Sequence, residues 1–122
     1  MKISKRLMLS ASLALGLSVV TGLSHAQTAL DSIQKSKLIK IAIPTDFHPY
    51  GFVGIDLQPQ GFDIDMAKEA AKRLGLEVEF KPIDWSAKEA ELSGKRVDAL
   101  WNGLTITEER KQNILFTAPY ME

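Results

Sequence analysis

Strand-like and helix-like stretches alternate along this chain, and the alternation limits the folds open to it. The stretch LIKIAI (38–43) carries one charge and stops at a proline, as a strand does. FDIDMAKEAAKRLG (62–75) follows with helix signals, and LEVEFKPI (76–83) then alternates apolar and charged residues. Because strands separated by helices join in parallel, we expect an α/β fold with an open, mostly parallel sheet and flanking helices.

The helix predicted over 62–75 has matching signals at both ends. Its acids come early, its basic residues come late, and Gly75 stands at the stop. We interpret Asp63 and Asp65 as helix-start acids rather than a catalytic pair. One face of the helix is expected to be apolar and to consist of Ile64, Ala67, Ala71 and Leu74.

The remaining elements are shorter. Residues 44–61 hold three prolines and three glycines and are expected to form a loop or hairpin. Residues 86–95 predict a short polar helix closed by Gly94, and 96–101 a third strand. Thr107 can cap a brief helix that ends near Gln112, and NILFTAPY (113–120) is expected to be one more strand.

The amino terminus has the pattern of a secretory signal peptide. Three cations in MKISKR precede an apolar run from Leu7 to Leu23, and the small residues of SHA follow. We expect cleavage between Ala26 and Gln27. The alternative, a membrane anchor, is disfavoured because the run is short and interrupted by hydroxyl residues. Residues 27–37 would then be a polar lead into the domain.

Charge and cysteine content exclude several classes of function. Cleavage removes three of the 15 basic residues and none of the 15 acidic ones, which leaves a net charge of −3. That balance argues against nucleic acid or an anionic membrane as partner. The chain has no cysteine, which excludes a disulfide framework and lipid attachment through an N-terminal cysteine. A periplasmic protein fits these observations.

Polar and aromatic residues follow each of the three expected strands. Ligands of open α/β sheets bind outside the carboxyl ends of the strands, so these residues are the candidates for a site. The candidates are Asp46, Phe47, Trp85, Asn102, Gly103, Thr105 and Arg110. Apolar walls with a few polar groups suit a small-molecule pocket. No nucleophile or metal-ligand set accompanies them, so we expect no catalytic residue, metal or cofactor.

Each candidate also has a simpler structural explanation. Phe47 and Trp85 could pack against the core. Asp46 and Asn102 are common in turns, and Thr105 could open a capping box. We favour a pocket because all of these residues fall at strand ends.

Arg110 lies in the first turn of a predicted helix, where the helix dipole disfavours a cation. A surface salt bridge is one explanation, worth about 0–1 kcal/mol. The other is a two-point grip on a carboxylate, in which each charge-assisted hydrogen bond contributes about 1.5–3 kcal/mol. That exceeds a dipole penalty of about 0.3–1 kcal/mol. We therefore predict a carboxylate site with aromatic walls.

Five segments then resemble a known family: KLIKIAIPTDFHPY, GFDIDMAKEAAKRLGLEVEF, IDW, SGKRVDALWNGLTITEER and FTAPYM. In order and near-family spacing, they are similar to the polar amino-acid periplasmic binding proteins of ABC importers, solute-binding protein family 3. SAKEAELSGK (86–95) is one residue shorter than the family pattern. The resemblance implies a type 2 periplasmic-binding fold, with two α/β lobes that close on a free, polar amino acid delivered to a permease in the inner membrane.

The resemblance also implies a role for each candidate residue. Arg110 would bind the α-carboxylate, helped by the backbone and hydroxyl of Thr105, and Gly103 would offer backbone to the α-ammonium. Phe47 and Trp85 would sandwich the side chain. The residues that would reach toward its far end, which favour a polar or cationic ligand, are Asp46 and Asn102.

By the same resemblance, residues 38–122 correspond to the first lobe, and the sequence stops before the hinge and the second lobe with its ammonium-binding acid. With one wall, we expect millimolar affinity or weaker, since millimolar binding corresponds to about 4 kcal/mol and micromolar to about 8. Two alternatives remain open. One is an enzyme on the same fold, such as a cyclohexadienyl dehydratase using Asp46, and the other is the sensing lobe of a membrane receptor.

Overall fold

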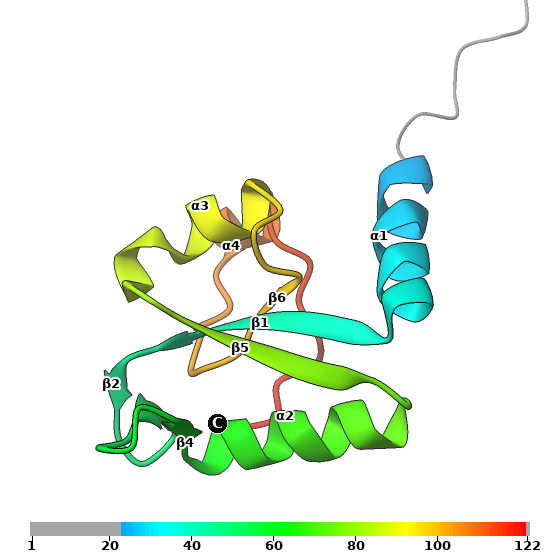
Figure 1. Cartoon of the computed structure of the whole chain (residues 1–122). Coiled ribbons are helices and arrows are strands. Elements are labelled where there is room, and N and C mark those ends of the chain that lie inside the picture. The colour runs from blue at the N-terminus through cyan, green and yellow to red at the C-terminus, as the bar shows by residue number, and fades with distance from the viewer. Residues whose placement is uncertain (1–22, 122) are drawn as a thin grey trace, which may run out of the picture.

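Three parallel strands form the central sheet, in the order β5-β1-β6. The structure is a computed structural model and describes residues 23–121. Its elements are α1 (Leu23–Ser36), β1 (Leu38–Pro44), β2 (Asp46–Phe47), β3 (Gly51–Val53), β4 (Pro59–Gln60), α2 (Phe62–Arg73), β5 (Glu77–Ile83), the 3-10 turn η1 (Trp85–Ala87), α3 (Lys88–Ser93), β6 (Ala99–Leu100) and α4 (Glu108–Lys111). The helix α2 covers one face of the sheet, and α3 and α4 lie over the other face (Figure 1). The predicted open parallel sheet with flanking helices is confirmed.

The central strand β1 is the most buried part of the sheet. Its residues pair in register with β5 on one side and with β6 on the other, for example Ile41 with Phe80 and with Ala99. Ile41 and Ile43 are almost fully buried and pack with Ile64 of α2 in the hydrophobic core. Because all three strands run in parallel, their carboxyl ends meet at one edge.

The helix α2 forms where its apolar spacing predicts. Ile64, Ala67 and Ala71 face the core, as expected. Leu74 does not, since it is 72% exposed, and its assignment to the apolar face is wrong. The chain turns at Gly75, which has φ +69°, and the N–H of Leu76 donates to the carbonyl of Ala71 at 2.8 Å. This Schellman ending carries Leu74 off the buried face.

The expected hairpin between β1 and α2 is a small antiparallel sheet, β2-β3-β4. It is fastened to the start of α2, because the carbonyls of Pro49 and Tyr50 accept hydrogen bonds from the N–H groups of Phe62 and Asp63 (3.1 and 2.8 Å). Those N–H groups have no partner within the helix, so the loop satisfies them. The hairpin that carries Phe47 is thereby held against the start of α2.

Two expected strands differ in the structure. The third is shorter than 96–101, with only Ala99–Leu100 paired as β6. Residues 113–120 form no strand, although the extended chain passes from the α4 side of the sheet to α2 (Figure 1). Leu115, within this segment, is 98% exposed. Within residues 23–121 this β-favouring segment pairs with no strand, so propensity alone does not make a strand.

The amino-terminal prediction is only partly covered by the described residues. Residues 1–22 of the expected signal peptide lie outside them, and its cleavage remains a prediction. The expected polar lead, 27–37, is largely helical, because α1 runs from Leu23 to Ser36 and the chain turns at Lys37 with φ +58°. Within residues 23–121, no helix has both the length and the apolar character needed to cross a membrane.

Candidate functional site

The sheet brings the predicted strand-end residues to one edge. Pro44, the last residue of β1, pairs with Ile83 at the end of β5, and the N–H of Trp101 donates to the carbonyl of Ala42 at 3.2 Å. In the strand order β5-β1-β6, Trp85 follows β5 and therefore lies at one side of this edge. Gly103 follows β6 and lies at the other side. Phe47 comes between them, after the central strand.

The ring of Phe47 lies beside the backbone of Gly103. Gly103 has φ +55°, and a Cβ atom added there would lie 3.1 Å from Cε1 of Phe47. The backbone conformation and the ring both favour glycine at this position. Phe47 is 44% exposed, and its ring lies 5.5 Å from that of Tyr50. An aromatic surface and an open stretch of backbone thus adjoin at the edge.

Arg110 is held by two contacts outside its own helix. Its Nε donates to Oε1 of Glu89 in α3 at 3.3 Å, and its Nη1 donates to the carbonyl of Thr105 at 2.9 Å. Thr107 caps α4 as predicted, by accepting a hydrogen bond from the N–H of Arg110 at 3.2 Å. The side chain of Arg110 is 29% exposed. Within residues 23–121, its Nη2 group has no hydrogen-bond partner.

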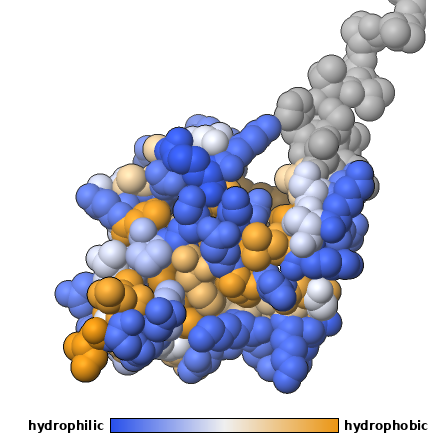
Figure 2. Space-filling model, viewed as in Figure 1, coloured by the Kyte–Doolittle hydropathy of each residue, from blue (hydrophilic) through white to orange (hydrophobic). Residues whose placement is uncertain are grey.

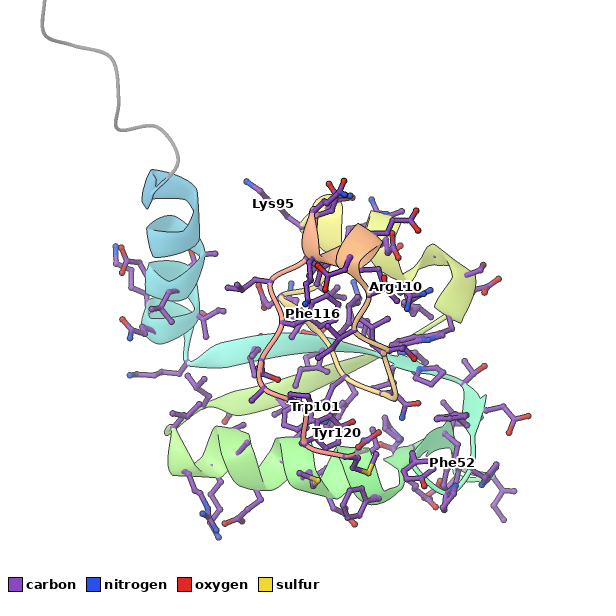
Figure 3. All side chains as sticks on the ribbon, turned by 180° about the vertical axis from the view of Figure 1, so that it is seen from behind. Phe52, Lys95, Trp101, Arg110, Phe116 and Tyr120 are labelled. Carbon is purple, nitrogen blue, oxygen red and sulfur yellow. The ribbon has the colours of Figure 1, made fainter. Side chains whose placement is uncertain are left out.

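The salt bridge to Glu89 is the simpler explanation for Arg110 that the sequence left open. The two explanations are compatible, because the bridge and the Thr105 carbonyl leave Nη2 for a ligand. A guanidinium fixed at two nitrogens also loses less side-chain entropy when the third binds. Figure 3 shows Arg110 between α3 and α4, on the half of the molecule nearer β2.

Trp85 opens the turn that follows β5. Asp84 caps this turn by accepting hydrogen bonds from the N–H and hydroxyl of Ser86 (2.9 and 2.8 Å), which lower the pKa of Asp84. The Trp85 ring is half-buried, and Nζ of Lys88 lies 5.8 Å from its centroid. Across the edge, Asp46 is exposed and lies 3.4 Å from the His48 ring.

Asn102 lies beneath the edge rather than on it. It is 3% exposed, and its Nδ2 donates to Oδ2 of Asp63 at 3.0 Å. Within the described residues, its Oδ1 is buried without a partner. The side chain of Asn102 also fills the space beside Gly51, where a Cβ would collide with its amide. Asn102 therefore joins the end of β6 to α2 and to the hairpin.

From the sequence we interpreted Asp63 only as a helix-start acid, but in the structure it has a wider role. It does stand in the first turn of α2, but it is 1% exposed and also accepts a hydrogen bond from the Tyr120 hydroxyl at 3.0 Å. Burial raises the pKa of Asp63, and the bond from Tyr120 opposes that shift. Its spacing is the sequence signal that predicts this burial. Asp63 lies four residues before Ala67, so the two residues share the buried face of the helix.

Tyr120 ties the carboxyl-terminal segment to the same cluster. Its ring meets that of Trp101 edge-on at 6.1 Å, and both side chains lie near the middle of Figure 3. Burial raises the pKa of Tyr120, and the hydrogen bond and charge of Asp63 raise it further. Asp63 thus connects α2, the segment that follows β6 and the carboxyl-terminal segment.

Two further observations concern parts of the protein outside this site. Residues 23–121 contain no group of three His, Cys, Asp or Glu side chains that could hold a metal ion. An open groove runs beside α2 and β5, and it contains none of the predicted site residues. Its lining consists of Gln58, Pro59, Lys68, Ala71, Leu76, Val78 and Phe80.

An open parallel sheet with an arginine, an aromatic ring and exposed backbone at its carboxyl edge defines an α/β lobe of the small-molecule-binding class. The family within this class can also be identified. The chain belongs to the bacterial extracellular solute-binding proteins, family 3, whose model matches residues 39–122.

Curated relatives agree with this family. The chain is 32% identical over 116 residues to a probable amino-acid ABC transporter-binding protein of Haemophilus influenzae, covering 95% of this chain and 45% of that protein. It is 38% identical over 107 residues to the histidine-binding periplasmic protein of Salmonella typhimurium, covering 86% and 40%. A cyclohexadienyl dehydratase of Pseudomonas aeruginosa is 28% identical over 118 residues, covering 97% and 44%. The chain thus spans less than half the length of these relatives.

Solved structures share the fold. One is an ABC uptake transporter substrate-binding protein from Streptococcus pneumoniae with bound histidine, which has 38% identity and a TM-score of 0.74 over 79% of this chain and 39% of that one. Another is the arginine-bound form of domain 1 from TmArgBP, a T. maritima protein, with 37% identity and a TM-score of 0.70 over 74% and 71%. The fold of this chain is therefore that of one domain of such proteins.

Proposed function

We propose that this chain is the amino-acid-binding lobe of an extracytoplasmic solute-binding protein that supplies an ABC importer. The observation that carries the proposal is Arg110, fixed by Glu89 and Thr105 at the carboxyl edge of the sheet with Nη2 unpaired within residues 23–121. A guanidinium in that position suits the α-carboxylate of an amino acid. The names of the relatives support the same ligand class.

In the proposed complex, the amino acid lies across the edge with its carboxylate at Nη2 of Arg110. Thr105 adds its backbone N–H and hydroxyl, and Gly103 offers backbone near the α-ammonium. Phe47 and Trp85 flank the side chain. Toward its far end stand Asp46, which is exposed, and Asn102, which acts from beneath by holding the segment before Gly103.

The proposal extends to location and partners. Residues 1–26 direct export and are removed between Ala26 and Gln27, residues 27–37 lead into the lobe, and residues 38–122 form the lobe. The mature protein is periplasmic, and a full-length protein that contains this lobe delivers its ligand to a permease in the inner membrane. Support comes from the family match and from relatives named as periplasmic proteins.

The proposal is tested by replacing Arg110 and a matched arginine. Arg96 makes the same two kinds of contact, with Oε1 of Glu91 at 3.0 Å and the carbonyl of Ala90 at 3.1 Å, but it lies away from the carboxyl edge. Arg110→Ala is expected to weaken binding by about tenfold or more, because a charge-assisted pair is lost. Arg96→Ala should bind as the parent does.

Calorimetry with L-histidine, L-arginine and L-cystine on the full chain provides the measurement. These ligands are the amino acids named in related proteins. Binding by Arg110→Ala as tight as that of the parent would overturn the carboxylate site. Absence of binding to any standard amino acid or to cystine would overturn the function.

A second function, catalysis, is favoured by one observation, the similarity to cyclohexadienyl dehydratase. Asp46 is the acid at the edge that would serve as proton donor or acceptor. It is exposed and stands beside His48, without the burial that adjusts a catalytic carboxyl. Most of the relatives are named as binding proteins, and we propose that this chain is not an enzyme. Formation of aromatic product from prephenate or arogenate would show otherwise.

A further inference from the structure

We propose that Glu89 recognises the α-ammonium of the amino acid whose carboxylate binds Arg110, so that this lobe alone reads both charges of the ligand. The inference rests on the proposed function and assigns a new binding residue to the same site. Glu89 lies in α3, four residues after Trp85, and its carboxylate is the ion-pair partner of Arg110.

The contact between Glu89 and Arg110 leaves the glutamate available. Oε1 lies 3.3 Å from Nε, at the long end of hydrogen-bond distances, and the pair makes a single contact rather than two parallel ones. Within residues 23–121, Oε2 of Glu89 has no partner. The side chain of Glu89 is 51% exposed and can turn toward a second cation at little cost.

Position makes that second cation the α-ammonium. An α-amino acid carries its carboxylate and ammonium on the same carbon atom, so an acid that touches the carboxylate-binding arginine stands within reach of the ammonium. An arginine alone attracts carboxylates of every kind. Paired with an acid on its flank, it favours a zwitterion over a simple anion, because the acid repels an anion that brings no cation.

The other acids of the edge are less suitable. Asp46 lies beside His48, and Oδ1 of Asp84 accepts both hydrogen bonds of the η1 cap from Ser86. Asp63 is buried and holds Asn102 and Tyr120. Among the described acids of this edge, Glu89 is the one in contact with Arg110.

The test compares each amino acid with its α-hydroxy analogue, in which a hydroxyl replaces the ammonium. L-histidine is paired with imidazolelactate and L-arginine with argininate. In the parent chain, we expect the amino acid to bind about fivefold to tenfold more tightly than the analogue, the range of a partly exposed charge-assisted bond. In Glu89→Gln, we expect that preference to fall to about twofold or less, while the hydroxy acid binds as tightly as before or more tightly.

Glu91→Gln is the matched control. Glu91 lies in the same helix and pairs with Nε of Arg96 at 3.0 Å, so this variant loses a similar surface charge and ion pair without touching Arg110. It should keep the preference of the parent. Thermal unfolding of each variant accompanies the binding measurements, because a change in stability alone does not alter the ratio between two ligands.

The outcomes separate this inference from the function on which it rests. If the parent binds the amino acids but Glu89→Gln retains the full preference over the hydroxy acids, Glu89 does not read the ammonium and the inference is overturned. The same holds if the parent shows no preference. If the parent binds neither kind of ligand, or if Arg110→Ala binds as the parent does, the proposed function fails and the inference fails with it.

Discussion

Arg110 and Arg96 show why a contact pattern alone does not define a site. Each arginine places Nε against a glutamate of α3 and donates an Nη hydrogen to a backbone carbonyl. The side chains differ in position, because Arg110 follows β6 at the carboxyl edge of the sheet and Arg96 precedes it. Exposed ion pairs of this kind contribute about 0–1 kcal/mol, so neither arginine is explained by stability.

Gly103 is expected to be required for both its conformation and its contact with Phe47. Gly103→Ala should lower the free energy of unfolding by about 1–2 kcal/mol, the cost of a left-handed backbone in an L-residue. The added Cβ, 3.1 Å from Cε1 of Phe47, should also displace the ring and weaken amino-acid binding. Urea unfolding and calorimetry measure the two effects.

Gly75→Ala is the control for this prediction. Gly75 has a similar φ, +69°, but a Cβ there would meet nothing within 4 Å. It should lose similar stability and bind amino acids normally. Equal binding by both variants would show that the contact between Gly103 and Phe47 has no part in the site.

Tyr120 is expected to make stability depend on alkaline pH. Burial and the carboxylate of Asp63 raise its pKa in the folded state above the ordinary value of 10.0. A raised folded-state pKa gives stability that is fully present below the unfolded-state value and is lost as the pH rises through the folded-state value. The parent should therefore be more stable than Tyr120→Phe by about 1 kcal/mol at neutral pH, and the difference should narrow above pH 10.

Urea unfolding between neutral pH and pH 11 checks this expectation. Tyr50→Phe serves as the control, because the Tyr50 hydroxyl makes no hydrogen bond within residues 23–121, while its ring contacts Phe47 and Phe62. A constant difference between the parent and Tyr120→Phe across the whole range would contradict the role of the phenol.

Among the helices and strands, α2 is the element that holds the residues of the site in position. Its start is fastened to the hairpin through the carbonyls of Pro49 and Tyr50, and Asp63 reaches from its first turn to Asn102. Figure 2 shows apolar residues over the middle of the visible face and over the β2–β4 sheet, where Ile55 and Leu57 are exposed. The hairpin therefore depends on α2 for its position more than on a core of its own.

The packing of α2 against β1 predicts a large effect at Ile64. Ile64 is 0% exposed and packs with Ile41 and Ile43, so Ile64→Ala should lower the free energy of unfolding by about 2–5 kcal/mol. Ile55→Ala makes the same chemical change on a side chain that is fully exposed and should change stability by about 0.5 kcal/mol or less. Denaturant unfolding of both variants measures the contrast, and similar losses would place the core elsewhere.

For the whole molecule, the affinity of the single lobe is the quantity to measure. One wall without closure is expected to bind in the millimolar range or more weakly, which corresponds to about 4 kcal/mol. Calorimetry on the full 122-residue chain decides the value, and a micromolar constant would show that closure adds little.

The sequence by itself determined the order of the main elements between residues 38 and 112, the parallel sheet, the ends of α2 and the positions of the strand-end residues. These follow from local signals, namely apolar spacing, caps and turn glycines, which act within a few residues. Tertiary structure alone decided that Asp63 is buried against Asn102 and Tyr120, and that Arg110 meets Glu89. It also decided that 113–120 forms no strand. Those outcomes join residues distant in sequence, and pairing across such distances depends on which neighbours the fold supplies rather than on the preference of any one segment.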